Sequence, residues 1–289
     1  MYASLLYKSN CYLAEGPMWH AKRKSFLWVD IDGKAFHEYN LQNGNVETWQ
    51  MQQRVSLIVE SNDDNLILGT EYGLISFNPA TNEMKLLADI EKDILTNRSN
   101  DGACDATGRL WIGTMARDFT PAAGSLYCIN KDLVLTKKLE GLTIPNGLVW
   151  SLDNKRMYFI DTPTLCVRSF LFDIEAGDIQ FEKVVIEIEP QLGMPDGMAI
   201  DEEGMLWIAH WNGFGVYRWN PLTGQLLDKI ALPVPQVSSC AFGGDDLNYL
   251  FITTARENMT DADVFKYPDS GNVFIVETDV RGVPAYKFG

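Results

Sequence analysis

Short apolar stretches separated by polar turns recur along the chain, and the clearest example lies within residues 193–210. Residues 197–200 and 205–209 are apolar stretches of strand length, and an Asp-Glu-Glu-Gly turn joins them. This pattern is typical of a β-hairpin. A hairpin folds the chain back on itself, so we expect Asp196, just before the first strand, to lie near His210, just after the second.

The second strand of this hairpin has counterparts along the whole chain. Their leading residues are Leu27, Leu66, Leu110, Met157, Leu206 and Leu250, so successive units lie 39 to 49 residues apart. Short strands at such a period, with no convincing helical stretch, are typical of a β-propeller. The sequence therefore predicts an all-β, six-bladed propeller with four antiparallel strands per blade, formed by residues 1–289 as one domain. A β-sandwich or a barrel would not predict this periodicity.

Two further features of the pattern concern ring closure and the core. A strand-like segment near residues 3–7 has no repeat of its own, and we expect it to complete the sheet of the last blade, which ends near residues 273–277. Trp28, Trp111 and Trp207 occupy equivalent positions in second strands, so we expect them in the core.

A polar or small residue precedes each second strand by ten to twelve positions. These residues are Glu15, Ser56, Asn100, Asn146, Asp196 and Cys240. The first strand of a propeller blade lines the central channel, so residues at one phase of the repeat form a ring at one end of it. Glu15, Asn146 and Asp196 are therefore expected to converge, although they are far apart in the sequence.

The chemistry of these three side chains is that of oxygen ligands. Two carboxylates and one amide suit a single hard or borderline divalent cation, with Ca²⁺ or Zn²⁺ preferred and Mg²⁺ or Mn²⁺ as further candidates. The alternative is that Asn146-Gly147 and Asp196-Gly197 are ordinary turn dipeptides, which is the simpler interpretation of either one alone. Their shared phase favours a metal site at one end of the channel.

The net charge and the cysteine content limit the classes of partner and the cellular compartment that we expect. Lys plus Arg number 24 and Asp plus Glu number 39, giving a net charge of −15, which disfavours nucleic acid and anionic membranes. The five cysteines form no C-x-x-C pair, which favours reduced thiols in a cytoplasmic protein over a zinc knuckle or a disulfide framework. No secretory signal and no apolar run of about eighteen residues is visible. We expect a monomer or a weak homo-oligomer.

A series of short motifs resembles one protein family. The motifs are Glu15-Gly16-Pro17, residues 98–102 (Arg-Ser-Asn-Asp-Gly), 113–115 (Gly-Thr-Met), 145–148 (Pro-Asn-Gly-Leu), 195–198 (Pro-Asp-Gly-Met) and 238–244 (Ser-Ser-Cys-Ala-Phe-Gly-Gly). Together and in this order they are similar to the senescence marker protein, regucalcin and gluconolactonase family, over nearly the whole chain. That resemblance implies a six-bladed propeller that binds one divalent metal, and mostly lactonases acting on sugar lactones.

The resemblance also implies residue roles. Glu15, Asn146 and Asp196 would be the metal ligands, and Asp196 would also be the general base. Arg98 and Asn100 would contact the substrate. Many animal members have two glutamates after the Gly-Thr-Met-Ala segment, and the second helps to hold the substrate; this chain has Arg117-Asp118 there. Asp118 would take that role with a shorter reach, and the extra charge of Arg117 would alter substrate choice.

Three functional hypotheses remain open. The first is a metal-dependent lactonase that opens a sugar-derived lactone, as gluconolactonases do, to the aldonic acid. The second keeps the site but changes the substrate to another ester or a phosphotriester. The third is a non-enzymatic, calcium-binding regulatory propeller, which would need only the metal ligands; Arg98, Asn100 and Asp118 on the same face favour an enzyme. No G-x-S-x-G context is present, so a serine hydrolase is not indicated. His210 is either a wall of the pocket, or support for a ligand, or a surface-loop residue.

Overall fold

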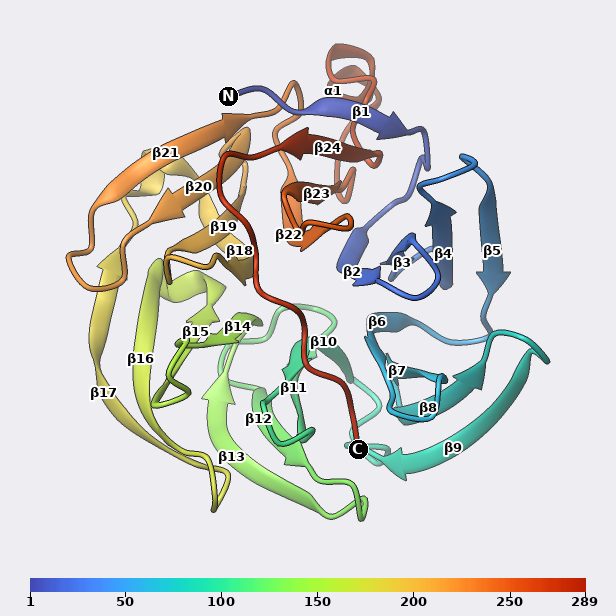
Figure 1. Ribbon diagram of the computed structural model, residues 1–289, viewed down its shortest axis with the longest axis vertical. Coiled ribbons are helices and arrows are strands. Elements are labelled where there is room, and N and C mark those ends of the chain that lie inside the picture. The colour runs from blue at the N-terminus through green and yellow to red at the C-terminus, as the bar shows by residue number, and fades with distance from the viewer.

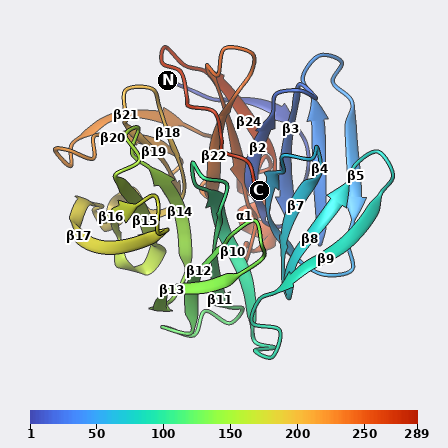
Figure 2. The same cartoon turned by 60° about the horizontal axis from the view of Figure 1, so that its bottom comes forward.

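The computed structural model describes residues 1–289 as six four-stranded antiparallel sheets set around a central channel. Figure 1 looks down this channel, and the sheets follow one another around the ring in chain order. The tilted view of Figure 2 shows each sheet as a twisted blade standing beside its neighbours. The all-β, six-bladed propeller predicted from the repeats is confirmed.

Blades 1 to 3 are each built from four consecutive strands. Blade 1 contains β2 (Ala14–His20), β3 (Ser25–Asp30), β4 (Ala35–Asn40) and β5 (Val46–Gln50). Blade 2 contains β6 (Val55–Glu60), β7 (Leu66–Thr70), β8 (Gly73–Asn78) and β9 (Glu83–Asp89). Blade 3 contains β10 (Asn97–Cys104), β11 (Leu110–Ala116), β12 (Gly124–Ile129) and β13 (Leu135–Leu142).

Blades 4 and 5 follow the same plan, and blade 6 differs. Blade 4 contains β14 (Pro145–Trp150), β15 (Arg156–Asp161), β16 (Cys166–Asp173) and β17 (Asp178–Glu187). Blade 5 contains β18 (Met194–Ile200), β19 (Leu206–Trp211), β20 (Gly215–Trp219) and β21 (Leu226–Ala231). Blade 6 contains β22 (Val237–Gly243), β23 (Tyr249–Thr254), β24 (Val273–Glu277) and, as its outermost strand, β1 (Ser4–Tyr7).

The N-terminal strand closes the ring. β1 pairs antiparallel with β24, with Ser4 opposite Ile275, so the first and last parts of the chain share one sheet. The predicted completion of the last blade by the N-terminus is therefore confirmed. Closure in this way pairs an edge of blade 6 that would otherwise stay open.

Helices are few and short. They are α1 (Asp261–Lys266) and the 3₁₀ turns η1 (Thr162–Thr164) and η2 (Pro190–Leu192). α1 begins with a capping box in which Thr260 and Asp263 satisfy each other's backbone N–H groups. No helix in the structure has the length and apolar character needed to cross a membrane.

The apolar core lies between the blades. It divides into six clusters, and each joins two neighbouring blades; Leu27 of blade 1 and Leu68 of blade 2, for example, belong to the same cluster. Full burial of such a side chain contributes roughly 1.5–3 kcal/mol. The five cysteines are buried and free.

The three tryptophans predicted to lie in the core are almost fully buried, at 0–1% exposure. Trp111 and Trp207 donate their indole N–H groups to the turn aspartates Asp105 and Asp201, both at 2.9 Å. These bonds satisfy a buried donor and tie the turn of the hairpin to the strand that follows it.

Each innermost strand is interrupted by a β-bulge at the same height. The strand pairing shifts between Pro145 and Leu148 in blade 4 and between Pro195 and Met198 in blade 5, and the other four inner strands shift at equivalent places. A bulge leaves residues outside the ladder and changes the direction of their side chains. Asn146 and Asp196 are each the first residue of such a bulge.

The end of the chain crosses the channel. We call residues 282–289 the C-terminal strap. Gly282 donates its backbone N–H to Leu247 of blade 6 at 2.8 Å, and Phe288 donates to Glu60 of blade 2 at 2.8 Å. Figure 1 shows this segment in red, running over the middle of the ring. It lies at the end of the channel where the inner strands finish.

Candidate metal centre and active site

Four polar residues of the predicted ring lie at the bulges, at the end of the channel where the inner strands begin. Glu15, Asn100, Asn146 and Asp196 are buried, with exposures of 9%, 8%, 4% and 6%. They come from blades 1, 3, 4 and 5, so only the closed ring brings them together. Ser56 lies at the bulge of blade 2, and its Oγ is 2.6 Å from Ser99 Oγ. The ring position predicted for Cys240 is wrong: the strand pairing of blade 6 passes over Ser238, whereas Cys240 pairs with Ile252 two residues beyond the bulge.

A chain of hydrogen bonds fixes the orientation of Asn146. Its Nδ2 donates to Thr162 Oγ1 at 2.8 Å, and its Oδ1 accepts from Asn100 Nδ2 at 3.1 Å. Thr162 in turn donates to the carbonyl oxygen of Pro195, at 2.8 Å, immediately before Asp196. The amide oxygen of Asn146 therefore keeps a fixed direction with one lone pair to spare, and Thr162 links the amide nitrogen of Asn146 to the backbone that carries Asp196.

The carboxyl groups of Glu15 and Asp196 lack protein partners that would stabilise their charges. Asp196 makes no hydrogen bond through its carboxylate, and Glu15 accepts only from the N–H of Gly16, at 3.2 Å. Burial and the neighbouring Asp101 raise the pKa of Glu15 to about 8. Burial, followed by the charges of Glu15 and Asp101, raises the pKa of Asp196 well above its ordinary value, and Arg98 opposes this only in part.

These features fit a bound divalent cation. Two buried acids whose ionisation is disfavoured by burial and by neighbouring acids are stabilised by a positive charge between them, and the spare lone pair of Asn146 is a third oxygen donor. No group of three or more histidine, cysteine, aspartate or glutamate side chains gathers closely enough to hold a metal ion. The candidate set is of another kind, because its third ligand is an amide.

The raised pKa of Glu15 predicts how pH and metal act together on stability. In the metal-free protein, the folded state keeps a proton on Glu15 up to about pH 8, whereas the unfolded chain loses that proton near pH 4.5. The unfolded state then binds fewer protons, so the stability of the metal-free protein falls as pH rises through this window. A divalent cation displaces that proton, so we expect CaCl₂ to raise the melting temperature more at pH 8 than at pH 6. Thermal melts with CaCl₂ or EDTA measure this, and an equal rise at both pH values would contradict it.

Arg98 lies inside the site and organises Asn100. Its Nη1 donates to Asn100 Oδ1 at 2.6 Å and to the Ser99 carbonyl oxygen at 2.9 Å. Burial lowers the pKa of Arg98, while Asp32, Glu257 and Glu15 oppose the shift. Both amide hydrogens of Asn100 are used within the protein, by the Pro145 carbonyl and by Asn146. Asn100 therefore has an oxygen lone pair, and no N–H, left for a ligand.

Asp118 occupies an exposed turn after β11. Its Oδ1 accepts from the Thr120 N–H at 3.1 Å and from Thr120 Oγ1 at 2.8 Å, and these bonds lower its pKa. The turn lies at the same end of the channel as the buried acids, because Ala116 at the end of β11 pairs with Asn97 at the start of β10. The structure nevertheless does not bring Asp118 into contact with those acids. The neighbouring Arg117 is paired with Glu71 at 2.9 Å.

His210 packs against the segment that leads into Asp196. It is fully buried, its ring stacks on Tyr217 at 4.0 Å between centroids, and its Nδ1 donates to the Leu192 carbonyl oxygen at 2.9 Å. Burial lowers the pKa of His210 to about 4, so the ring is neutral at pH 7. The surface-loop interpretation is wrong, since stacking and burial hold the ring under η2. The expected proximity of Asp196 to this residue is confirmed at the backbone, where Pro195 pairs with His210.

Three residues near the site were not anticipated from the sequence: Asp101, Thr162 and Glu257. Asp101 is the second bulge residue of blade 3, where Gly147 and Gly197 stand in blades 4 and 5. Burial raises the pKa of Asp101 to about 6. The sequence did contain a signal for Asp101: the Asn-Asp-Gly motif of blade 3 has an extra aspartate before its glycine, compared with the Asn-Gly and Asp-Gly motifs of blades 4 and 5. Thr162 and Glu257 lie in loops beyond second strands, and no repeated pattern marks them.

Comparison with known proteins places this geometry among related chains. A family model described as the SMP-30/Gluconolactonase/LRE-like region matches residues 13–256. Regucalcin of Oryctolagus cuniculus is 35% identical over 285 residues, which cover 96% of this chain and 95% of the relative.

Two solved structures are similar over nearly the whole chain. One is described as a calcium-binding protein, regucalcin, from Agrobacterium tumefaciens; it is 29% identical with a TM-score of 0.95 and covers 100% of this chain and 97% of its own. The other is described as a luciferin-regenerating enzyme. It is 30% identical with a TM-score of 0.91, and the match covers 96% of this chain and 95% of that structure's chain.

Proposed function

The chain belongs to the SMP-30/gluconolactonase/LRE-like family, and from this premise we propose that it is a divalent-metal-dependent lactonase. The family supports a lactonase-type function. The proposed reaction opens a sugar-derived lactone to its aldonic acid. The observation that carries the proposal is the convergence of Glu15, Asn146 and Asp196, with a buried Asp196 carboxylate that has no partner in the protein.

Glu15, Asn146 and Asp196 would hold the cation. Ca²⁺ is our first choice, because the ligands are all oxygens and the similar regucalcin from Agrobacterium tumefaciens is described as calcium-binding; Zn²⁺, Mg²⁺ and Mn²⁺ are the alternatives. When bound, the cation supplies Lewis-acid polarisation of the lactone carbonyl.

Asp196 acts as the general base in this proposal. Its carboxylate takes a proton from the attacking water and returns one to the departing ring alkoxide. Burial and nearby acids raise the pKa of Asp196, whereas a cation lowers it. Because these effects oppose each other, the pKa of Asp196 would lie nearer to 7 than either effect alone would place it. Such a pKa suits proton transfer at physiological pH.

The substrate would be held by Arg98, Asn100 and Asp118. Arg98 donates to hydroxyl or carbonyl oxygens, and Asn100 accepts through the free lone pair of its amide oxygen. Thr120 occupies only Oδ1 of Asp118, so Oδ2 can accept from a sugar hydroxyl. Hydroxyl groups are discriminated strongly by such bonds, since a missing partner leaves a polar group unpaired.

A screen of aldonolactones tests the proposed function. Acid release is followed in a pH-stat with Ca²⁺, Zn²⁺, Mg²⁺ or Mn²⁺, alongside aryl esters and a phosphotriester. We expect turnover of at least one sugar lactone well above the ester controls. Tight Ca²⁺ binding without turnover of any substrate would instead support the calcium-binding regulator, and preferential ester or phosphotriester turnover would support the second hypothesis.

Replacement of Asp118 tests substrate recognition. Asp118→Ala should lower kcat/KM for hydroxylated sugar lactones about 10-fold or more, while an unsubstituted lactone and metal affinity change little. Asp132→Ala is the matched control, because Asp132 is an exposed turn aspartate at the opposite end of the same blade. Kinetics equal to wild type on every hydroxylated lactone would remove Asp118 from the site.

A further inference from the structure

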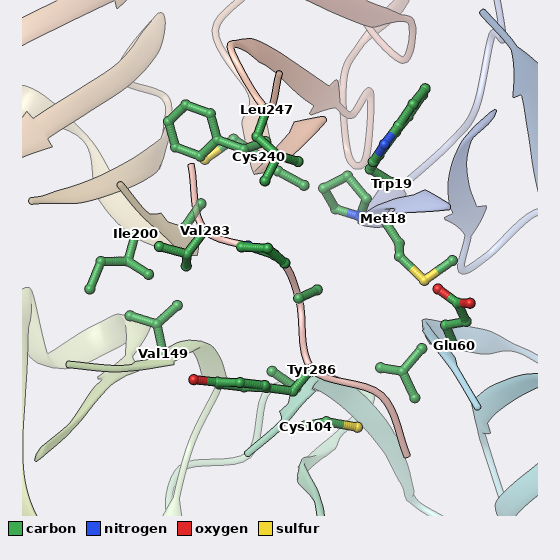
Figure 3. Close-up of a pocket in the computed structure, with 18 of the residues that line it drawn as sticks. Met18, Trp19, Glu60, Cys104, Val149, Ile200, Cys240, Leu247, Val283 and Tyr286 are labelled. Atoms are coloured by element: carbon green, nitrogen blue, oxygen red, sulfur yellow. The ribbon is translucent and has the colours of Figure 1, made fainter. Parts of the chain in front are cut away.

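A cavity opens at the end of the channel opposite the buried acids. It has a volume of about 660 Å³ and is formed where the inner strands finish, under the C-terminal strap. We call it the far chamber. Figure 3 shows it in close-up, with Val283 and Tyr286 of the strap crossing between walls that carry Trp19, Val149 and Ile200. Its volume is within the range of about 300–1,000 Å³ usual for small-molecule sites.

The walls of the far chamber are mostly apolar. Of the 35 residues that line it, 22 are hydrophobic. Ala103, Val149, Ala199 and Ala241 are partly exposed although the residues that follow them in the chain are buried, as expected of side chains that face the cavity from inner strands. Trp19 and Tyr286 add aromatic surface.

The charges at the rim are already paired. Lys24 pairs with Asp245, Lys287 with Glu60, and Lys22 with Asp64 at 2.6 Å. The lysines therefore offer no uncompensated positive charge to an anionic ligand.

Asp101 offers a free hydrogen-bond acceptor at the inner end of the far chamber. Asp101 lines the cavity, and its Oδ1 accepts from the Gly102 N–H at 2.7 Å. Its other oxygen, Oδ2, has no hydrogen-bond partner in the protein. A molecule in the chamber that carries an N–H or O–H group can therefore satisfy this oxygen.

The strap is held by its backbone at both ends, and between them only by side chains: Tyr286 bonds to Asn154 and Lys287 pairs with Glu60. Gly282 and Phe288 make backbone hydrogen bonds to Leu247 and Glu60, whereas residues 283–287 make none. The middle of the strap can move aside without breaking a backbone hydrogen bond, which gives a small molecule a way in.

From these features we propose that the far chamber is a second binding site, for a neutral and largely aromatic molecule with one hydrogen-bond donor directed at Asp101. The far chamber opens at the end of the channel opposite the proposed lactonase centre, and its inner end reaches Asp101, a neighbour of Glu15 and Asp196. The proposed binding does not depend on the lactonase function. Binding would bury apolar ligand surface against the inner strands and the strap.

N-phenyl-1-naphthylamine is a suitable probe. It is neutral and aromatic, carries a single N–H donor, and fluoresces more strongly in apolar surroundings. We expect saturable binding of one molecule per chain. The anionic counterpart 1-anilinonaphthalene-8-sulfonate has the same rings, so it should bind at least about tenfold more weakly because its sulfonate meets Asp101 and no free cation.

Filling the cavity locates the probe. Ala241→Phe and Ala103→Phe place a ring in the far chamber and should weaken probe binding at least tenfold. Ala80→Phe is the matched control, since Ala80 is exposed in the turn between β8 and β9. Tyr286→Ala, in the exposed part of the strap, removes an aromatic wall without changing an inner strand and should also weaken binding, which keeps the test valid should a cavity-filling variant fail to fold.

Three results would overturn the proposal: no saturable binding of the probe, equal affinity in folded cavity-filling variants and in Ala80→Phe, or unchanged affinity in Tyr286→Ala together with tighter binding of the sulfonate.

Discussion

Removal of the divalent cation should abolish lactone opening, with a loss of at least about a hundredfold. Lewis-acid stabilisation of charge in the transition state contributes several kcal/mol, and each 1.36 kcal/mol corresponds to a factor of about ten in rate. The buried acids are also affected, because without the cation the pKa of Glu15 is about 8 and that of Asp196 is raised well above its ordinary value. A protonated Asp196 cannot accept a proton from water.

The measurement compares protein treated with EDTA and dialysed, protein reconstituted with Ca²⁺, Zn²⁺, Mg²⁺ or Mn²⁺, and untreated protein. Metal content is determined by elemental analysis, and circular dichroism shows whether the stripped protein keeps its β structure. Recovery of activity with one of the ions is expected. Full activity in protein shown to be metal-free would exclude the proposed mechanism.

Asp196→Asn should lower kcat by about a hundredfold to ten-thousandfold, the usual contribution of a general acid or base. The substitution keeps an oxygen ligand but removes the proton acceptor. It also removes one negative charge, so metal affinity should fall, and rates must be measured at saturating metal.

Glu15→Gln is the matched control for this experiment. It removes one negative charge from the same cluster and keeps an oxygen ligand, but Glu15 is not the proposed base. We expect excess metal to restore most of the rate in Glu15→Gln and to leave Asp196→Asn slow. Recovery of the wild-type rate in both variants would reduce Asp196 to a metal ligand.

The ring architecture could be predicted from the sequence because one physical pattern repeats six times. Each second strand must be apolar to fill the space between blades, and Trp111 and Trp207 stand at the same place in their repeats. The closing strand was visible for a related reason, since residues 4–7 form a strand with no blade of their own. The convergence of Glu15, Asn146 and Asp196 followed from their shared phase, whereas their metal-binding and catalytic roles stay predictions.

Features outside the repeat were not predictable in this way. Thr162 orients Asn146 from a 3₁₀ turn, and Glu257 approaches Arg98 from a loop; nothing in local sequence shows where such segments return in space. The strap after β24 has no counterpart in other blades. The hairpin pattern correctly placed Asp118 at the end of the channel that holds the buried acids. It could not show that hydrogen bonds from Thr120 hold the Asp118 side chain in an exposed turn, because those bonds depend on the local geometry of the loop.

The bulges of the inner strands separate the parts of this protein that maintain the scaffold from those that determine its chemistry. The side chains of Asn100, Asn146 and Asp196 belong to residues that the strand pairing passes over. Exchanging one of them changes the ligands presented to the channel but leaves the ladder intact. The glycines that follow in blades 4 and 5 do not share this freedom, because a Cβ at Gly147 would lie 2.5 Å from the Met198 Cβ and one at Gly197 would lie 2.0 Å from Ser239 Oγ. A single substitution at Asn100, Asn146 or Asp196 can therefore change specificity. The glycines beside Asn146 and Asp196 must stay glycine, because only they let neighbouring blades pack this closely.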